Sequence, residues 1–214
     1  MAFMEEDLDM PVRQLLQIMQ DRTVERSTYF GVRAVKSPTD FWVYQEIMAE
    51  TKPDLIIEIG NFHGGSTLAL AHLCDNFGKG TVIGLDISHQ FVPNIVRVHP
   101  RITLIEGDAC ALFPQVSQLA KDAASILIIE DSSHTYENTL NVLRTFSPLV
   151  KPDGYFIVED SICHHGLVVG PNPGPYEAIE TFMDNNQDFE IDRSRESFFI
   201  TWNPKGYLRR RSVS

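Results

Sequence analysis

The residues LIIEIGNFHGGS, at positions 55–66, contain the clearest structural signal in this 214-residue chain. Leu55–Ile59 is almost continuously apolar, which is typical of a strand buried on both faces of a sheet. A glycine-rich turn follows at once, and Ser66–Cys74 has the pattern of a helix. A buried strand, a glycine turn and a helix in this order form the first unit of a parallel α/β sheet.

The same alternation continues along the chain. The predicted parallel strands are Leu55–Ile59, Thr81–Leu85, Ile102–Ile105, Ser125–Ile129 and Tyr155–Val158. The predicted helices between and after them are Ser66–Cys74, Gln90–Val98, Ala111–Lys121, Thr135–Leu149 and Tyr176–Asn185. Two last strands, Phe189–Asp192 and Ser197–Thr201, are close enough to pair as a hairpin. We therefore expect an α/β protein with a seven-stranded, mostly parallel, doubly wound sheet and an antiparallel edge.

Two helices precede the sheet. Glu6–Met19 has amphipathic helical spacing, and Ser37 followed by Pro38 is a typical helix start, with that second helix running to about Glu50. The length favours one domain. The expected organisation is an N-terminal helical extension over 1–50, a catalytic domain over 51–204 and a basic tail over 205–214.

Composition excludes several classes of partner. The chain has 18 Lys+Arg against 29 Asp+Glu, a net charge of −11, which argues against broad binding to nucleic acid. No apolar run approaches the roughly 18 residues of a membrane span, and Met1–Met10 is too acidic for a signal peptide. Three widely separated cysteines without a C-x-x-C motif favour reduced thiols in a cytoplasmic protein. A symmetric homo-oligomer is the usual expectation.

All five predicted parallel strands end in carboxylates. Because ligands of such sheets bind at the carboxyl ends of the strands, these acids are expected to share one edge. They are Glu58, Asp86, Asp108 (with Glu106), Asp131 and the pair Glu159-Asp160.

The glycine loop discriminates between nucleotide-binding templates. A phosphate-binding P-loop needs a lysine where this chain has Ser66, and a dinucleotide loop needs a glycine where it has Phe62. Glu58, Gly60, Gly64 and Ser66 match E-x-G-x-x-x-G-x-S, a pattern common in enzymes that use S-adenosylmethionine (SAM). SAM carries an ammonium and a sulfonium and no phosphate, so an acidic loop suits it.

Two further acids extend the predicted SAM site. Asp86 is placed for the two hydroxyls of a ribose, and Asp108-Ala109 is placed to frame the adenine. The predicted cofactor-binding residues are Glu58, Gly60, Asn61, Gly64, Gly65, Ser66, Asp86, Ile87, Asp108, Ala109 and Asp131.

Asp131, Glu159 and Asp160 follow two strands that are neighbours in a doubly wound sheet. Ionised carboxylates that converge repel one another unless a cation lies between them, and oxygen ligands favour Mg²⁺, then Mn²⁺ or Ca²⁺. His134, three residues after Asp131, is the candidate general base. The alternative without a metal makes His134 an ordinary helix residue and Glu159-Asp160 a helix cap.

These motifs, with Gly174–Ala178 (GPYEA) and Tyr29–Glu46, resemble the cephalosporin hydroxylase family over roughly residues 29–202. The resemblance implies the class I methyltransferase, Rossmann-like fold. The chain is also similar to metal-dependent O-methyltransferases that modify sugars of macrolide antibiotics. That similarity implies that Asp131, Glu159 and Asp160 bind Mg²⁺ (or Mn²⁺), while His134 takes the proton from the acceptor hydroxyl.

We therefore expect a SAM-dependent, Mg²⁺-dependent O-methyltransferase with Asp131 and His134 as catalytic residues. Its acceptor is expected to be a small-molecule hydroxyl, on a sugar moiety or a vicinal diol of a natural product. One alternative is a metal-dependent hydroxylase of a secondary metabolite, against which the lack of an H-x-D…H pattern counts. The other is a non-catalytic subunit with a SAM-binding fold, which would have no reason to retain mutually repelling acids.

Overall fold

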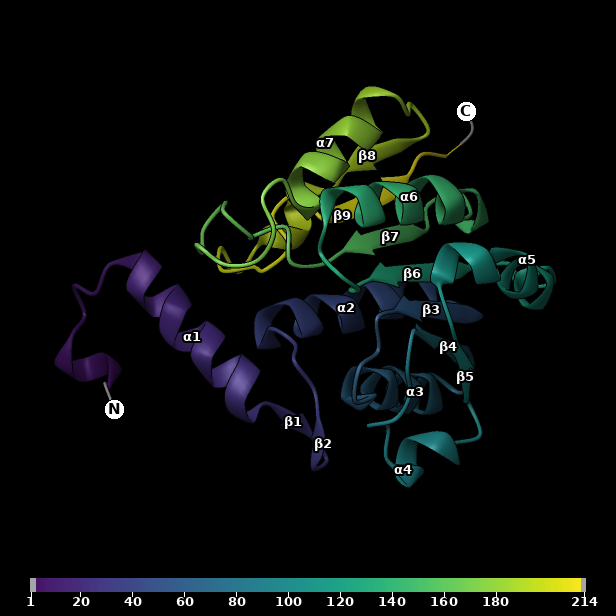
Figure 1. The fold of residues 1–214 in the computed structure, drawn as a ribbon, viewed down its shortest axis with the longest axis horizontal. Coiled ribbons are helices and arrows are strands. Elements are labelled where there is room, and N and C mark those ends of the chain that lie inside the picture. Colours follow the sequence, from purple (N-terminus) through teal and green to yellow (C-terminus); the bar gives the residue numbers. More distant parts are fainter. Residues whose placement is uncertain (1–2, 213–214) are drawn as a thin grey trace.

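A seven-stranded sheet runs through the protein in the order β5-β4-β3-β6-β7-β9-β8 (Figure 1). The structure, a computed structural model, describes residues 3–212. The strands are β3 (Leu55–Ile59), β4 (Thr81–Asp86), β5 (Ile102–Glu106), β6 (Ile126–Glu130), β7 (Tyr155–Val158), β8 (Phe189–Ile191) and β9 (Tyr207–Arg210). The first five, β3 to β7, are parallel to one another, and β9 is antiparallel to both β7 and β8. The predicted fold class is confirmed, and the strand order reverses between β3 and β6.

Helices cover both faces of the sheet. The longer helices are α1 (Val12–Arg26), α2 (Pro38–Thr51), α3 (Gly65–Phe77), α5 (Ala109–Ala120), α6 (Tyr136–Phe146) and α7 (Pro175–Asp184). One core cluster joins the sheet to α2 and α3, and the other joins it to α5, α6 and α7. The sheet is therefore the middle layer of three.

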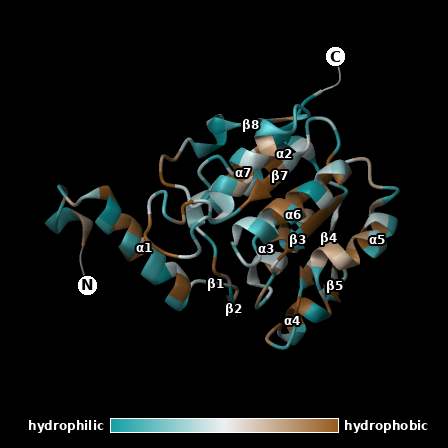
Figure 2. Ribbon diagram, turned by 45° about the horizontal axis from the view of Figure 1, so that its top comes forward, coloured by the Kyte–Doolittle hydropathy of each residue, from teal (hydrophilic) through white to brown (hydrophobic). Residues whose placement is uncertain are grey.

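The continuous apolar character of β3 follows from this layering. Leu55 and Ile57 pack into the α5–α7 layer, whereas Ile56 packs into the α2–α3 layer. Successive residues of a strand point to opposite faces, so a strand covered on both sides needs apolar residues at nearly every position. Figure 2 shows the hydrophobic residues concentrated on the strands and on the helix faces beside them.

Several predicted element boundaries were wrong. The opening helix was expected over Glu6–Met19, but α1 begins at Val12, after Pro11, and continues to Arg26. From residue 3 onward, a short 3₁₀ turn, Met4–Glu6, precedes it. The expected helix Gln90–Val98 is reduced to the single turn α4 (Asn94–Arg97). A short hairpin, β1 (Thr28–Tyr29) and β2 (Val32–Arg33), joins α1 to α2.

The seventh strand was also assigned to the wrong residues. Ser197–Thr201 was expected to form it, yet this segment follows a 3₁₀ helix (Arg193–Glu196) and is irregular. The strand is β9, which lies inside the segment expected to be a basic tail. Tyr207 and Leu208 are fully buried, while the Arg209 side chain extends outward to Asp153.

The two N-terminal helices differ in how they pack. Ser37 caps α2 by accepting the Asp40 N–H, as predicted, and α2 belongs to the core. The helix α1 extends away from the body (Figure 1), which it contacts through Leu16 and Met19 in a cluster with Trp202. Within residues 3–212 no helix combines the length and the apolar character that crossing a bilayer requires.

Candidate active site

A cavity of about 560 Å³ opens at the carboxyl ends of the parallel strands. This volume lies within the usual range for small-molecule sites, roughly 300–1,000 Å³. The cavity brings together eight of the predicted site residues: Gly60, Asp86, Ile87, Asp108, Ala109, Asp131, His134 and Asp160. It therefore lies at the edge, and near the switch point, where the topology predicts a ligand.

Gly60 allows two strand ends to approach each other closely. Its φ is +86°, and a Cβ built on it would lie 2.0 Å from the carbonyl oxygen of Asp131. The Asp131 N–H donates to the carbonyl of Ile59 at 2.8 Å, which fixes this contact. The turn then directs the Phe62 N–H to a carboxylate oxygen of Asp86 at 2.8 Å. Loop and acid are thus held in one fixed arrangement at the cavity wall.

Other predicted loop residues lie behind the cavity wall. Glu58 is completely buried and accepts a hydrogen bond from Thr67 of α3. Asn61 is buried and its side-chain oxygen lies 3.0 Å from Nε2 of His89. Gly64, Gly65 and Ser66 form the start of α3 and are likewise absent from the cavity lining among the described residues. Their contacts support the loop, and their role in cofactor binding stays a prediction.

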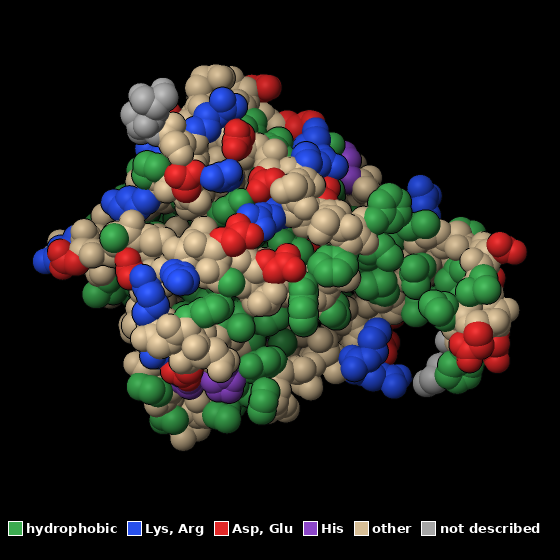
Figure 3. Space-filling view, turned by 180° about the vertical axis from the view of Figure 1, so that it is seen from behind, with side chains coloured by type: hydrophobic (Ala, Val, Ile, Leu, Met, Phe, Trp, Pro, Cys, Tyr) green, Lys and Arg blue, Asp and Glu red, His purple; other side chains and the backbone are tan. Residues whose placement is uncertain are grey.

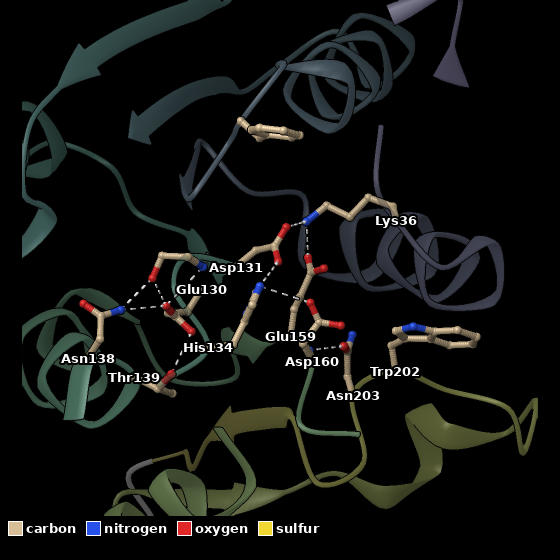
Figure 4. A network of polar contacts seen from close by, with 12 residues as sticks. Lys36, Glu130, Asp131, His134, Asn138, Thr139, Glu159, Asp160, Trp202 and Asn203 are labelled. Atoms are coloured by element: carbon tan, nitrogen blue, oxygen red, sulfur yellow. Dashed lines mark hydrogen bonds and ion pairs between the residues drawn. The ribbon is translucent and has the colours of Figure 1, made fainter. Parts of the chain in front are cut away.

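Asp131, His134 and Asp160 form the acidic centre of the cavity (Figure 4). One potential ligand atom from each lies within 4.8 Å of the others. Nε2 of His134 is 3.4 Å from Asp160 and 4.0 Å from Asp131. His134 and Asp160 both have left-handed backbones, with φ of 57° and 55°, which is a costly conformation for these residues. The Asp160 N–H is held by the side-chain oxygen of Asn203 at 3.2 Å.

Lys36 occupies the inner side of this centre, and the sequence interpretation had not included it. Its Nζ contacts Asp131 and lies 2.5 Å from Glu159 (Figure 4). The same atom lies 3.8 Å from Glu58. The lysine side chain is only 8% exposed. Glu159, a predicted metal ligand, is thus bonded to an ammonium and is not part of the Asp131–His134–Asp160 group.

The pKa values of this centre reflect burial and crowding. Burial raises the pKa of Asp131 and of Glu159 well above the usual range, and repulsion from other carboxylates adds to this. Burial alone would lower the pKa of Lys36, but the carboxylates of Asp131, Glu159 and Glu58 outweigh it and raise that pKa. The neighbouring carboxylates therefore favour the charged form of the lysine.

Glu130 fixes the turn that carries the centre. It is fully buried at the end of β6 and accepts hydrogen bonds from Ser132, from Asn138 at 3.4 Å and from Thr139 at 3.3 Å. Burial raises the pKa of its carboxyl. Because Ser132 precedes His134 by two residues, this network positions the turn on which the imidazole lies.

Asp40 ties the start of α2 to the C-terminal loop behind the centre. Its buried carboxylate accepts hydrogen bonds from the Thr201 hydroxyl, from the Trp202 N–H at 2.8 Å and from the Tyr207 hydroxyl at 2.8 Å. The same loop supplies Asn203, whose side chain also donates to Tyr44 at 2.8 Å. No local sequence signal connects residue 40 with residues 201–207.

The donor set fits a hard divalent cation. Two carboxylates and an imidazole converge on one point, and buried Nδ1 of His134 has no hydrogen-bond partner within the described part of the chain. Oxygen-rich sites of this kind suit Mg²⁺ or Mn²⁺ better than softer metals. The cavity wall fits SAM, because it presents Asp86 and Asp108 and has no lysine at the loop.

Comparison with known proteins gives consistent matches. The family described as rhamnosyl O-methyltransferase/CmcI matches residues 21–211. Rhamnosyl O-methyltransferase of Mycobacterium tuberculosis is 35% identical over 190 residues, which cover 86% of this chain and 78% of the relative. That of Mycobacterium leprae is 35% identical over 192 residues, covering 86% and 83%. A solved CmcI structure, described as a Mg–SAM form, has a TM-score of 0.70 at 24% identity, covering 90% and 84% of the two chains.

Proposed function

The chain belongs to the rhamnosyl O-methyltransferase/CmcI family, and from this premise we propose that it is a SAM- and Mg²⁺-dependent O-methyltransferase. The proposed acceptor is a hydroxyl of a small molecule, on a sugar, because the relatives are named rhamnosyl O-methyltransferases. The observation that carries the proposal is the convergence of Asp131, His134 and Asp160 in a cavity that also contains Gly60 and Asp86. The methyltransferase names of the relatives favour this activity over the hydroxylase and the non-catalytic subunit.

In this proposal the cavity wall holds the cofactor. The carboxylate of Asp86 binds the ribose hydroxyls, since Asp86 is the last residue of β4, where the ribose-binding acid is predicted, and already accepts the Phe62 N–H. Ile87 is 79% exposed and lies on the cavity wall, where its side chain can cover one face of the adenine. Asp108 caps α5 through the Ala111 N–H and forms the opposite rim.

The acidic centre would hold the metal. Asp131 and Asp160 are the proposed oxygen ligands, and Glu159 remains a proposed ligand once it is released from Lys36. A bound divalent ion lowers the pKa of a coordinated hydroxyl and orients its oxygen. His134 lies against both acids, so its Nε2 can accept the proton of the acceptor hydroxyl. The turn fixed by Glu130 keeps the imidazole in this position.

The test replaces His134 by glutamine. A general base contributes about 10²- to 10⁴-fold to a rate, so methyl transfer to a rhamnoside acceptor is expected to fall by that factor. SAM binding, measured by isothermal titration calorimetry, is expected to be unchanged. His164→Gln is the matched control, because His164 is exposed and its imidazole lies 3.1 Å from the Gly170 carbonyl, outside the acidic centre. A His134→Gln enzyme with the wild-type rate would remove this residue from the mechanism.

We also propose that α1 pairs with α1 of a second copy. Val12, Leu15 and Ile18 are 49%, 38% and 42% exposed, on the helix that contacts the body through Leu16 and Met19. Figure 3 shows hydrophobic side chains exposed along this projecting arm.

Sedimentation of a charged variant tests this pairing. Ile18→Glu is expected to shift the protein to a lower molar mass, because it places a carboxylate among the paired apolar residues. Leu119→Glu is the control, since Leu119 is 54% exposed on α5, far from this helix in the fold. A wild-type chain that sediments as a monomer would overturn the proposal.

The three cysteines are all unpaired, which supports the expected cytoplasmic location.

A further inference from the structure

Lys36 is a buried cation in the middle of the proposed metal ligands. We propose that Lys36 is the internal counter-cation of the carboxylate centre and that it competes with the divalent ion, so that the metal binds more weakly than the ligands alone would allow. This inference rests on the proposed metal-dependent function. It assigns a role to a residue that contacts neither cofactor nor acceptor in that function.

The two carboxylate oxygens of Asp131 face different groups. Its Oδ2 accepts a hydrogen bond from Lys36, while its Oδ1 is the oxygen that faces His134. A metal ion on the His134 and Asp160 side would therefore share one carboxylate with the ammonium. Two positive charges on the same carboxylate repel each other, and each withdraws electron density from the other's ligand.

Glu159 is the second point of competition. Its Oε1 is 2.5 Å from the ammonium, and its side chain is 8% exposed. While the ammonium holds this carboxylate, Glu159 is engaged as a hydrogen-bond acceptor. Removal of the ammonium would release a third carboxylate to the metal, which is the ligand set that the sequence predicts.

The charge balance explains why the position is a lysine. Glu58, Asp131, Glu159 and Asp160 contribute four negative charges when ionised, and Lys36 supplies one positive charge. Buried carboxylates without a counter-ion are strongly destabilising. The lysine therefore allows the centre to fold before a metal is bound, and the remaining negative charge still attracts one.

The surroundings keep Lys36 in place. It lines a small cavity of about 40 Å³ together with polar residues including Asp40, Tyr44 and Asn203. The small cavity has room for about one water molecule. The lysine side chain is buried, so a methionine of similar length can replace it without leaving a large void.

The test compares Lys36→Met with Lys79→Met. Lys79 forms an exposed ion pair with Asp54 at 2.8 Å, so its replacement makes the same change in charge far from the centre. Binding of Mn²⁺ alone, without SAM or acceptor, is measured by calorimetry, and melting is followed with and without Mn²⁺. Lys36→Met is expected to bind Mn²⁺ at least tenfold more tightly than wild type, to melt lower without metal and to gain more from Mn²⁺. Lys79→Met is expected to match wild type in metal affinity.

The outcomes separate this inference from the proposed function. If wild type binds Mn²⁺ and Lys36→Met binds it equally or more weakly, competition is refuted and the metal-dependent function stands. If no variant binds Mn²⁺, both are refuted. A Lys36→Met protein that folds only with Mn²⁺ and unfolds on chelation supports the counter-cation role. Lys36→Arg keeps the charge, so its Mn²⁺ affinity is expected to stay within about threefold of wild type, and a tenfold gain there would also contradict competition.

Discussion

Replacing Gly60 with alanine introduces a methyl group where β3 and the end of β6 leave no space. The residue has a φ of +86°, and a left-handed backbone costs an alanine about 1–2 kcal/mol. Its Cβ would lie 2.0 Å from the Asp131 oxygen and 2.6 Å from the Ser132 Cα. These are backbone atoms, so the strand ends must separate, which adds about 1–3 kcal/mol by analogy with overpacked cores. The free energy of unfolding should therefore fall by about 2–5 kcal/mol.

For a chain of this length, each kcal/mol corresponds to about 2–4 °C in Tm, so Gly60→Ala should melt about 4–20 °C below wild type. Circular dichroism measures the melting temperature, and the thermal shift with SAM measures binding. Gly78→Ala is the matched control, because Gly78 has a φ of +70° with no heavy atom within 4 Å of the added Cβ. The control isolates the backbone term. If both variants melt at the same temperature, the close contact with Asp131 has no energetic weight and the reasoning fails.

Three further predictions concern single groups. Asp86→Ala should weaken SAM binding by about 10- to 100-fold, the usual loss for hydrogen bonds to a charged group, and calorimetry with unchanged affinity would contradict the ribose assignment. Asp40→Ala leaves three buried donors unpaired and should cost at least about 2 kcal/mol in a urea titration; a wild-type midpoint would show that the network adds no stability. Burial raises the phenol pKa of Tyr155 to about 12 and those of Tyr44 and Tyr207 well above 10. At pH 10.5 these three phenols should stay protonated in the native protein and ionise only on unfolding, which tyrosinate absorbance would detect; full native ionisation at that pH would contradict their burial.

The sequence was sufficient for the elements whose signals are local. Leu55–Ile59 has the same bounds in the prediction and in the structure. A strand covered on both faces is almost continuously apolar, so its own residues identify it. The Ser37 cap of α2 was also predicted, since Ser, Pro and Asp act within one turn. The position of the strand-end carboxylates at one edge of the sheet followed from the parallel topology alone.

The remainder depended on contacts between distant residues. The strand β9 was predicted to be a basic tail, because its sequence contains Arg209 and Arg210. Its two fully buried residues, Tyr207 and Leu208, are recognisable only from the pairing of β9 with β7 and β8. Lys36 is 95 residues from Asp131 and 123 from Glu159, so no spacing rule could join them. Whether Glu159 binds metal depends on its contact with Lys36, so this role stays a prediction.

The hydrogen bond from Tyr207 to Asp40 spans 167 residues and has a consequence for synthesis of the protein. A ribosome must deliver residues 201–207 before Asp40 finds its donors and Asn203 reaches Asp160. Until then Asp40 and Lys36, in the N-terminal half, lack the C-terminal residues that surround them in the folded protein. The acidic centre is therefore completed only after residues 201–207 have been synthesised, and a chain stopped before residue 201 would lack the donors to Asp40 and the contact to Asp160.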